Sequence, residues 1–150
     1  MPHPGMRVNG DGFVIKHAEG VALTAVIDGL GHGQYAHRAA LKAREYVERH
    51  MEQDLTRLFR GVDRACRGTR GVVMAVARFQ WSDGTLTFGS IGDIAARVFG
   101  SPEPVHLRIR RGILGSQAPQ PVVTSHPWDP AGVLVLHSDG LSSRWRWSDF

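Results

Sequence analysis

Two apolar stretches of this 150-residue chain each end in the dipeptide Asp-Gly. The first, within residues 25–33, delivers Asp28 to a glycine-rich turn, and a helix-like pattern begins just after it. The second, within residues 133–140, delivers Asp139 to a similar turn. Short apolar runs bounded by turn residues are typical of buried strands. Two such strands can bring two carboxylates to one edge of a core, where oxygen ligands hold hard divalent cations.

The remaining pattern predicts a chain rich in strands. Apolar residues at helical spacing predict helices over residues 36–51 and 55–66, one directly after the other. Apolar runs and turn signals predict the following strands: 13–17, 21–27, 71–77, 86–88, 94–99, 105–109 and 133–137, with a short one at 122–123. Short strands joined by hairpins, with two helices inserted, indicate the α+β class with antiparallel sheets.

Composition indicates the cellular compartment of the protein. Cys66 is the single cysteine, so an internal disulfide is excluded and a reducing compartment is favoured. Its place on the apolar face of a predicted helix indicates a buried structural thiol. No apolar stretch approaches the roughly 20 residues of a membrane span, and the N-terminus carries no apolar signal region. We therefore expect a cytoplasmic protein.

The net charge of +4 comes from arginines scattered along the chain. Such a pattern fits a solvated surface, or a basic face that meets a phosphorylated or acidic partner. A dedicated nucleic-acid binder would more often place basic and aromatic residues together on one element. No nucleic-acid or membrane partner is therefore expected.

The segment Asp28-Gly29-Leu30-Gly31-His32-Gly33 resembles the Asp-Gly-x-Gly-His-Gly signature of the metal-dependent protein phosphatases (protein phosphatase 2C-like). Within that family the chain is most similar to the small bacterial SpoIIE-type enzymes of the RsbX-like branch. Further matches follow in the family's order: Gly10-Asp11, Gly68-Thr69-Arg70-Gly71, Gly92-Asp93, Gly112-Ile113-Leu114-Gly115 and Ser138-Asp139-Gly140-Leu141. The resemblance covers about residues 8–145.

The resemblance implies a β-sandwich of two antiparallel sheets flanked by helices, in α-β-β-α order, as one domain over residues 1–150. Family members carry a further Asp-bearing strand after the Ser-Asp-Gly strand, which closes the metal site and the sheet. This chain ends at Phe150, so we expect a domain that is shortened at its C-terminus and lacks that strand.

The resemblance also implies an activity. Family members hydrolyse phosphoserine or phosphothreonine with two Mn²⁺ or Mg²⁺ ions and a metal-activated water, without a covalent phosphoenzyme. Carried over by motif, Asp28 and Asp139 are the catalytic candidates: Asp28 would bridge the metals, with the carbonyl of Gly29 beside it, and Asp139 would bind one metal. Asp11 would act from an outer shell. Asp93 stands where the branch commonly has Asn, so it is either a ligand or a turn-stabilising residue.

Three further residues are candidates for roles around the site. Arg7 is the candidate for the substrate phosphate, because a guanidinium offers a fork of donors; an ordinary surface arginine is the alternative. Arg70 is open to the same two interpretations. His32 is expected to cap the backbone or to stand behind the ligands, because the family's metals prefer oxygen.

The resemblance implies a partner as well: a phosphorylated STAS-domain protein that controls a sigma factor or a stressosome. A second hypothesis is a catalytically weak or inactive phosphatase-fold module that binds such a partner, which the missing strand favours. A third is a nucleotide-binding loop at residues 29–33. The dinucleotide fingerprint, however, needs a third glycine where Gln34 stands, and a βαβ unit where two helices follow in succession. The oligomeric state is left open.

Overall fold

The computed structural model of the chain describes residues 9–138 and Arg146. Within them the elements follow in the order β1 (Asp11–Ala18), β2 (Val21–Gly29), α1 (Gly33–Arg49), α2 (Leu55–Ala65), β3 (Val72–Gln80), β4 (Thr85–Ile91), β5 (Ala95–Phe99), β6 (Thr124–Pro127) and β7 (Val133–His137). Both predicted helices and most predicted strands are therefore confirmed, with bounds that shift by a few residues.

The strands form two antiparallel sheets. A five-stranded sheet has the order β1-β2-β3-β4-β6, and a two-stranded sheet pairs β5 with β7. Tight turns join β1 to β2 and β3 to β4, so the larger sheet is built mainly from hairpins. This arrangement confirms the α+β class with two antiparallel sheets.

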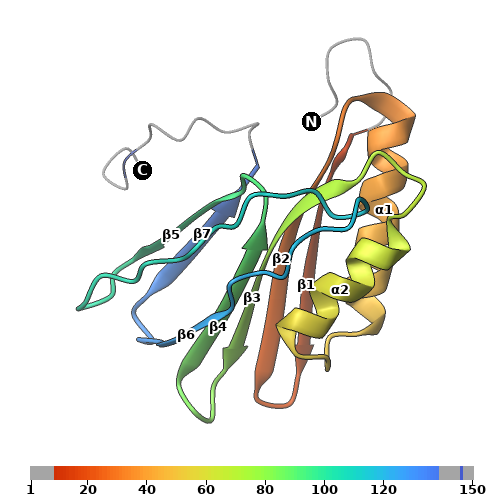
Figure 1. Ribbon diagram of the computed structural model, residues 1–150. Coiled ribbons are helices and arrows are strands. Elements are labelled where there is room, and N and C mark those ends of the chain that lie inside the picture. Colours follow the sequence, from red (N-terminus) through yellow and green to blue (C-terminus); the bar gives the residue numbers. More distant parts are fainter. Residues whose placement is uncertain (1–8, 139–145, 147–150) are drawn as a thin grey trace.

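Both helices cover one face of the larger sheet (Figure 1). The buried positions of α1 recur every three or four residues, as the spacing of one helical face requires: Ala36, Ala39, Ala40, Ala43 and Val47. Asp54 caps α2 by accepting a hydrogen bond from the backbone N–H of Arg57 at 2.9 Å. Neither helix combines the length and the apolar character needed to cross a membrane.

The smaller sheet packs on the opposite face of the larger one. Phe88 and Leu86 of β4 lie fully buried there, with side chains of β5 and β7 packed against them. The described residues thus give the layer order helices, large sheet, small sheet (Figure 1). The second helical layer that the α-β-β-α expectation included is not found in this part of the chain. The expected loss of the C-terminal strand concerns residues beyond those described.

Two strand predictions need correction. The strand predicted at 105–109 is wrong, because the backbone of this segment joins no ladder. Leu107 packs partly buried against the core between the sheets, which explains the alternating pattern, but one isolated bridge between Ile91 and Arg110 is the nearby link to the sheet. The short strand predicted at 122–123 is found slightly later, as β6.

Candidate metal centre

Two carboxylates face each other across the first hairpin. The register pairs Asp11 of β1 with Asp28 of β2. Ile27, the neighbour of Asp28, is buried on the helix side, so both carboxylates lie on the face toward the smaller sheet. Directly opposed residues in antiparallel strands have Cβ atoms about 4.5–5.5 Å apart, and like charges at that distance repel. A cation between them would remove this repulsion.

The end of β7 reaches the same place. Ser138 follows β7 directly, and its hydroxyl donates a 3.3 Å hydrogen bond to Oδ2 of Asp11. The start of β1, the end of β2 and the end of β7 therefore meet at one edge of the two sheets. Asp139 comes next in the sequence, but it lies outside the described residues, as does Arg7. Their predicted roles stay predictions.

Glycine is required where α1 meets the site. A Cβ atom at Gly29 would clash with the carbonyl oxygen of Ala36 in the first turns of α1. The backbone N–H of Gly29 also donates to the carbonyl of Gly10 at 2.8 Å, which closes the β1 side of the turn. Gly31 has a φ of +83°, in the left-handed region that favours glycine. The glycine-rich turn is thus held tightly between β1 and the start of α1.

Two residues outside the recognised motifs support Asp11. The side chain of Asn9 accepts a hydrogen bond from the backbone N–H of Asp11 at 3.1 Å. His37 of α1 donates from Nδ1 to the carbonyl of Asn9 at 3.0 Å. The long sequence separation between His37 and Asn9 leaves no local signal for this contact. His32 is the N-cap residue of α1, but its side chain makes no capping hydrogen bond.

Asp93 lies exposed in the turn that follows β4. The C-terminal ends of β2 and β4 flank the start of β3, so this turn is at the same sheet edge as Asp28. Among residues 9–138, however, no three His, Cys, Asp or Glu side chains come close enough together to hold a metal ion. The structure brings Asp11 and Asp28 together and leaves Asp93 outside such a group. A ligand role for Asp93 remains a prediction.

The donors that do meet suit a hard cation. Two carboxylates and the nearby carbonyl of Gly29 are oxygen ligands, which Mg²⁺ and Mn²⁺ prefer over nitrogen and sulfur. The negative charge of the carboxylate pair also favours a cation electrostatically. The residues present therefore fit a divalent metal.

A match to a family model identifies the family of this chain. The family model described as Stage II sporulation protein E (SpoIIE) matches residues 18–144. The chain belongs to the SpoIIE family. It is also 22% identical over 140 residues to the phosphoserine phosphatase RsbX of Bacillus subtilis (strain 168), and this match covers 92% of the chain and 70% of RsbX.

Solved structures agree with the family. A chain described under "The bacterial stressosome: a modular system that has been adapted to control secondary messenger signaling" is 30% identical, with a TM-score of 0.91 over 96% of this chain and 76% of that one. RsbX in complex with magnesium is 21% identical, with a TM-score of 0.88 over 96% and 73%. The PP2C phosphatase domain of SpoIIE from Bacillus subtilis gives a TM-score of 0.79 at 17% identity, over 93% of this chain and 44% of that one. The protein phosphatase 2C-like fold and the SpoIIE/RsbX-like branch are thereby confirmed.

Proposed function

We propose that this SpoIIE-family chain is a metal-dependent serine/threonine phosphoprotein phosphatase. The observation that carries the proposal is the pair Asp11 and Asp28, opposed in register and joined by Ser138 at the edge of the two sheets. The similarity to a phosphoserine phosphatase supports the same activity.

The metal-holding residues in this proposal are Asp28, the carbonyl of Gly29 and Asp139, with Asp11 behind them and Asp93 as a further candidate. When bound, the two Mn²⁺ or Mg²⁺ ions supply positive charge for the phosphoryl oxygens and activate the water that attacks phosphorus. The similarity to RsbX, whose structure holds magnesium, supports a divalent cation.

The chain's own residues fix the geometry of these donors. Ser138 donates to one carboxylate oxygen of Asp11, and Asn9 accepts from the backbone N–H of Asp11, so both the side chain and the backbone of this residue are held. The absence of a side chain at Gly29 lets the first turns of α1 pack directly against the end of β2, and its absence at Gly31 lets Arg70 lie against the turn. Orientation by such outer contacts commonly changes metal affinity or activity by about 10- to 100-fold.

The proposed substrate is a phosphorylated signalling protein of the STAS-domain type, in the cytoplasm. The similarity to a stressosome chain and to RsbX supports a partner of this kind. Exposed arginines at positions 108, 110 and 111 lie on the segment that leads to the site, since the carbonyl of Arg110 accepts from Gly92 beside Asp93. A basic surface there suits a phosphorylated partner.

The experiment measures release of inorganic phosphate from a phosphoserine-bearing STAS-domain protein with and without Mn²⁺ or Mg²⁺. We expect release only with metal. Asp28→Asn and Asp139→Asn should lower kcat by at least about 100-fold, and Asp11→Asn by about 10- to 100-fold. Asp83→Asn is the matched control, because Asp83 also precedes a glycine but is exposed in the β3–β4 turn, at the far end of the sheet.

The alternative hypothesis, a catalytically weak or inactive binding module, predicts a different result. Such a module would bind the phosphorylated partner more tightly than the unphosphorylated one, yet release no phosphate at saturating metal. Equal activity of wild type, Asp28→Asn and Asp83→Asn would count against the proposed catalytic centre itself.

A further inference from the structure

An exposed arginine lies against the glycine-rich turn. Arg70 stands just before β3, and its guanidinium carbon is 4.9 Å from the ring centroid of Tyr35, in the first turn of α1. The ring of Tyr35 is itself 64% exposed. Two exposed side chains thus form a cation–π contact beside the glycine-rich turn.

The same guanidinium reaches the turn directly. A Cβ atom at Gly31 would lie 2.8 Å from Nη1 and 3.4 Å from Cδ of Arg70, so the arginine lies across the position that a side chain would occupy. Gly31 is three residues after Asp28, which limits the distance between their Cα atoms to about 11 Å. Arg70 therefore lies beside the turn that carries Asp28.

The backbone around Arg70 is fixed on both sides. The backbone N–H of Leu30 donates to the carbonyl of Gly71 at 3.0 Å, which ties the turn after β2 to the start of β3. The hydroxyl of Thr69 donates to the carbonyl of Cys66 at 2.6 Å and accepts from the backbone N–H of Gly71 at 3.0 Å. Arg70 thus extends from an anchored segment.

Nothing in the described part of the chain neutralises Arg70. No carboxylate there lies within ion-pair distance of it, whereas Arg44 and Arg57 pair with Glu48 and Asp54. The first turn of α1 also contains no acidic residue. Stacking on an aromatic ring fixes the plane of a guanidinium and leaves its N–H donors free at the edge. Those donors match two phosphate oxygens in a fork.

We propose that Arg70, held over the ring of Tyr35, is a binding residue for the phosphoryl group of the substrate. This inference rests on the proposed function and adds a substrate contact that Asp11 and Asp28 cannot make. Two anionic carboxylates repel a phosphate unless cations stand between them, whereas Arg70 attracts it directly. The arginine would bind the phosphoryl oxygens on the side of the turn, at the mouth of the site.

The test compares Arg70→Ala, Arg70→Lys, Tyr35→Ala and Tyr35→Phe with wild type. Two quantities are measured: KM and kcat for the phosphoprotein, and the affinity for inorganic phosphate in the presence of Mn²⁺. We expect Arg70→Ala to weaken phosphate affinity and raise KM by about 10- to 100-fold, as loss of a charge-assisted hydrogen bond does. Arg70→Lys should recover part of the affinity, since lysine offers charge without the fork.

The tyrosine variants test whether the contact of Arg70 with the ring of Tyr35 contributes to phosphate binding. Tyr35→Phe keeps the ring and should behave as wild type, whereas Tyr35→Ala should weaken phosphate affinity by about 2- to 5-fold. In the Arg70→Ala background, Tyr35→Ala should add no further loss, because the residue it positions is gone. Arg67→Ala is the matched control, as Arg67 is an exposed arginine three residues away in the same segment.

The outcomes distinguish this inference from the proposed function. The inference is overturned if Arg70→Ala and Arg67→Ala bind inorganic phosphate with the affinity of wild type, or if wild type does not bind it. In either case the proposed phosphatase activity still holds if phosphate release depends on metal and on Asp28. If wild type releases no phosphate from the phosphoprotein, the proposed activity fails. A loss of inorganic phosphate binding confined to Arg70→Ala would still support Arg70 as the phosphate contact. Equal melting temperatures of the variants show that the fold is intact.

Discussion

Burial decides the chemistry of Cys66, the chain's single cysteine. Its side chain is fully buried at the end of α2, and its thiol donates to the carbonyl of Ala39 in α1 at 3.7 Å. Desolvation raises the pKa of this thiol to about 11, against the charge of Lys42 and together with that of Asp63. The thiol therefore stays protonated at neutral pH, which agrees with the structural role predicted for it.

We expect Cys66 to be unreactive in the native protein. Ellman's reagent at about pH 8 should modify the thiol only after unfolding. Because the folded pKa of about 11 lies above the ordinary value of 9.0, the unfolded state loses its proton first, and this group's contribution to stability falls as pH rises through that window. The free energy of unfolding of wild type, relative to Cys66→Ala, should fall by up to about 3 kcal/mol between pH 9 and about pH 11. Urea titration at a series of pH values measures this difference. A difference in unfolding free energy that does not change with pH, or rapid modification of the native thiol, would contradict a buried, protonated Cys66.

Local sequence predicts a residue's place only where pairing is also local. Asp28 is recognisable at a strand end, and the tight hairpin at Gly20 places Asp11 opposite it. Arg70 offers no such signal. Its contact with Gly31 depends on the pairing of β2 with β3, which two intervening helices separate in the sequence.

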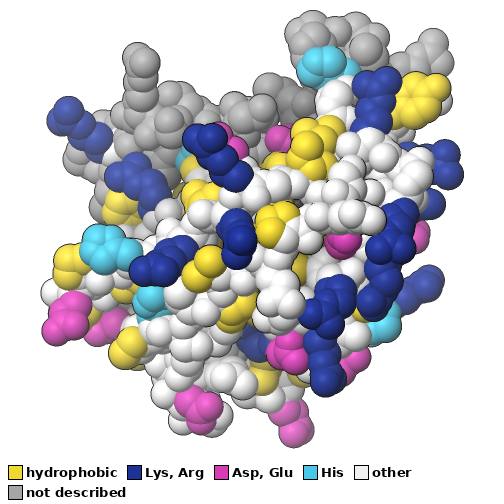
Figure 2. Space-filling view, in the orientation of Figure 1, with side chains coloured by type: hydrophobic (Ala, Val, Ile, Leu, Met, Phe, Trp, Pro, Cys, Tyr) yellow, Lys and Arg dark blue, Asp and Glu magenta, His cyan; other side chains and the backbone are white. Residues whose placement is uncertain are grey.

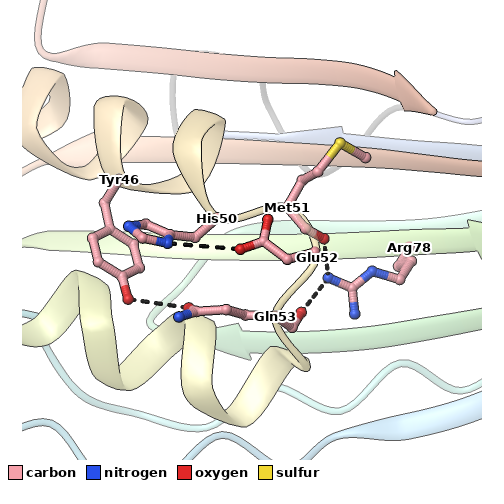
Figure 3. A network of polar contacts seen from close by, with 6 residues as sticks. All are labelled: Tyr46, His50, Met51, Glu52, Gln53 and Arg78. Carbon is pink, nitrogen blue, oxygen red and sulfur yellow. Dashed lines mark hydrogen bonds and ion pairs between the residues drawn. The ribbon is translucent and has the colours of Figure 1, made fainter.

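At the scale of elements, Arg78 joins the two helices to the sheet. Its guanidinium extends from β3 and donates from Nη2 to the carbonyls of Met51, at 2.6 Å, and Gln53 in the connection between α1 and α2 (Figure 3). The hydroxyl of Tyr46 donates to the side chain of Gln53 at 3.0 Å, which closes the network from α1. Partial burial lowers the pKa of Arg78, against the charges of nearby carboxylates. The arginine satisfies backbone carbonyls of the connection that no helix or strand ladder pairs.

Removal of the Arg78 side chain should destabilise the packing of the two helices on the sheet. We expect Arg78→Ala to lower the free energy of unfolding by about 2–3 kcal/mol, because two hydrogen bonds from a charged donor are lost. Arg78→Lys should lose less, since an ammonium can still reach one carbonyl. Arg38→Ala, which removes an exposed arginine of α1, should change stability by less than about 0.5 kcal/mol. Chemical denaturation measures all three, and equal stabilities of the two alanine variants would contradict this role.

Some elements could be predicted from the sequence because their signals are local. The apolar stripes of α1 and α2 and the continuous run of β3 are properties of local sequence, and all three elements were found where their patterns predicted. β6 has only polar residues and a proline, and it is a strand because β4 offers it an open edge. The segment at 105–109 alternates like a strand because Leu107 packs against the core, but its backbone joins no ladder.

At the scale of the whole molecule, positive charge and exposed apolar side chains meet beside the candidate site. Lys and Arg side chains spread over the face seen in Figure 2. Beside the site, the exposed side chains of Arg108, Arg110 and Arg111 occur in one segment with Ile109 and Ile113, which are 45% and 39% exposed. The segment passes the candidate centre, because Ile113 lies against Gly71, next to Arg70. A protein partner can thus be contacted by charge and by apolar area at once.

This arrangement predicts a difference between large and small substrates. The variant Arg108→Gln/Arg110→Gln/Arg111→Gln should lower kcat/KM for the phosphoprotein by about tenfold at low salt, because steering by clustered charge is lost. It should leave hydrolysis of para-nitrophenyl phosphate unchanged, since that molecule does not extend to the segment. The matched control, Arg38→Gln/Arg49→Gln/Arg60→Gln, removes the same charge from the exposed surface of the two helices and should act much more weakly. Raising ionic strength should reduce the difference, as the Debye length falls below about 10 Å above 0.1 M salt. Equal losses in both triple variants would mean that net charge, and not this segment, attracts the partner.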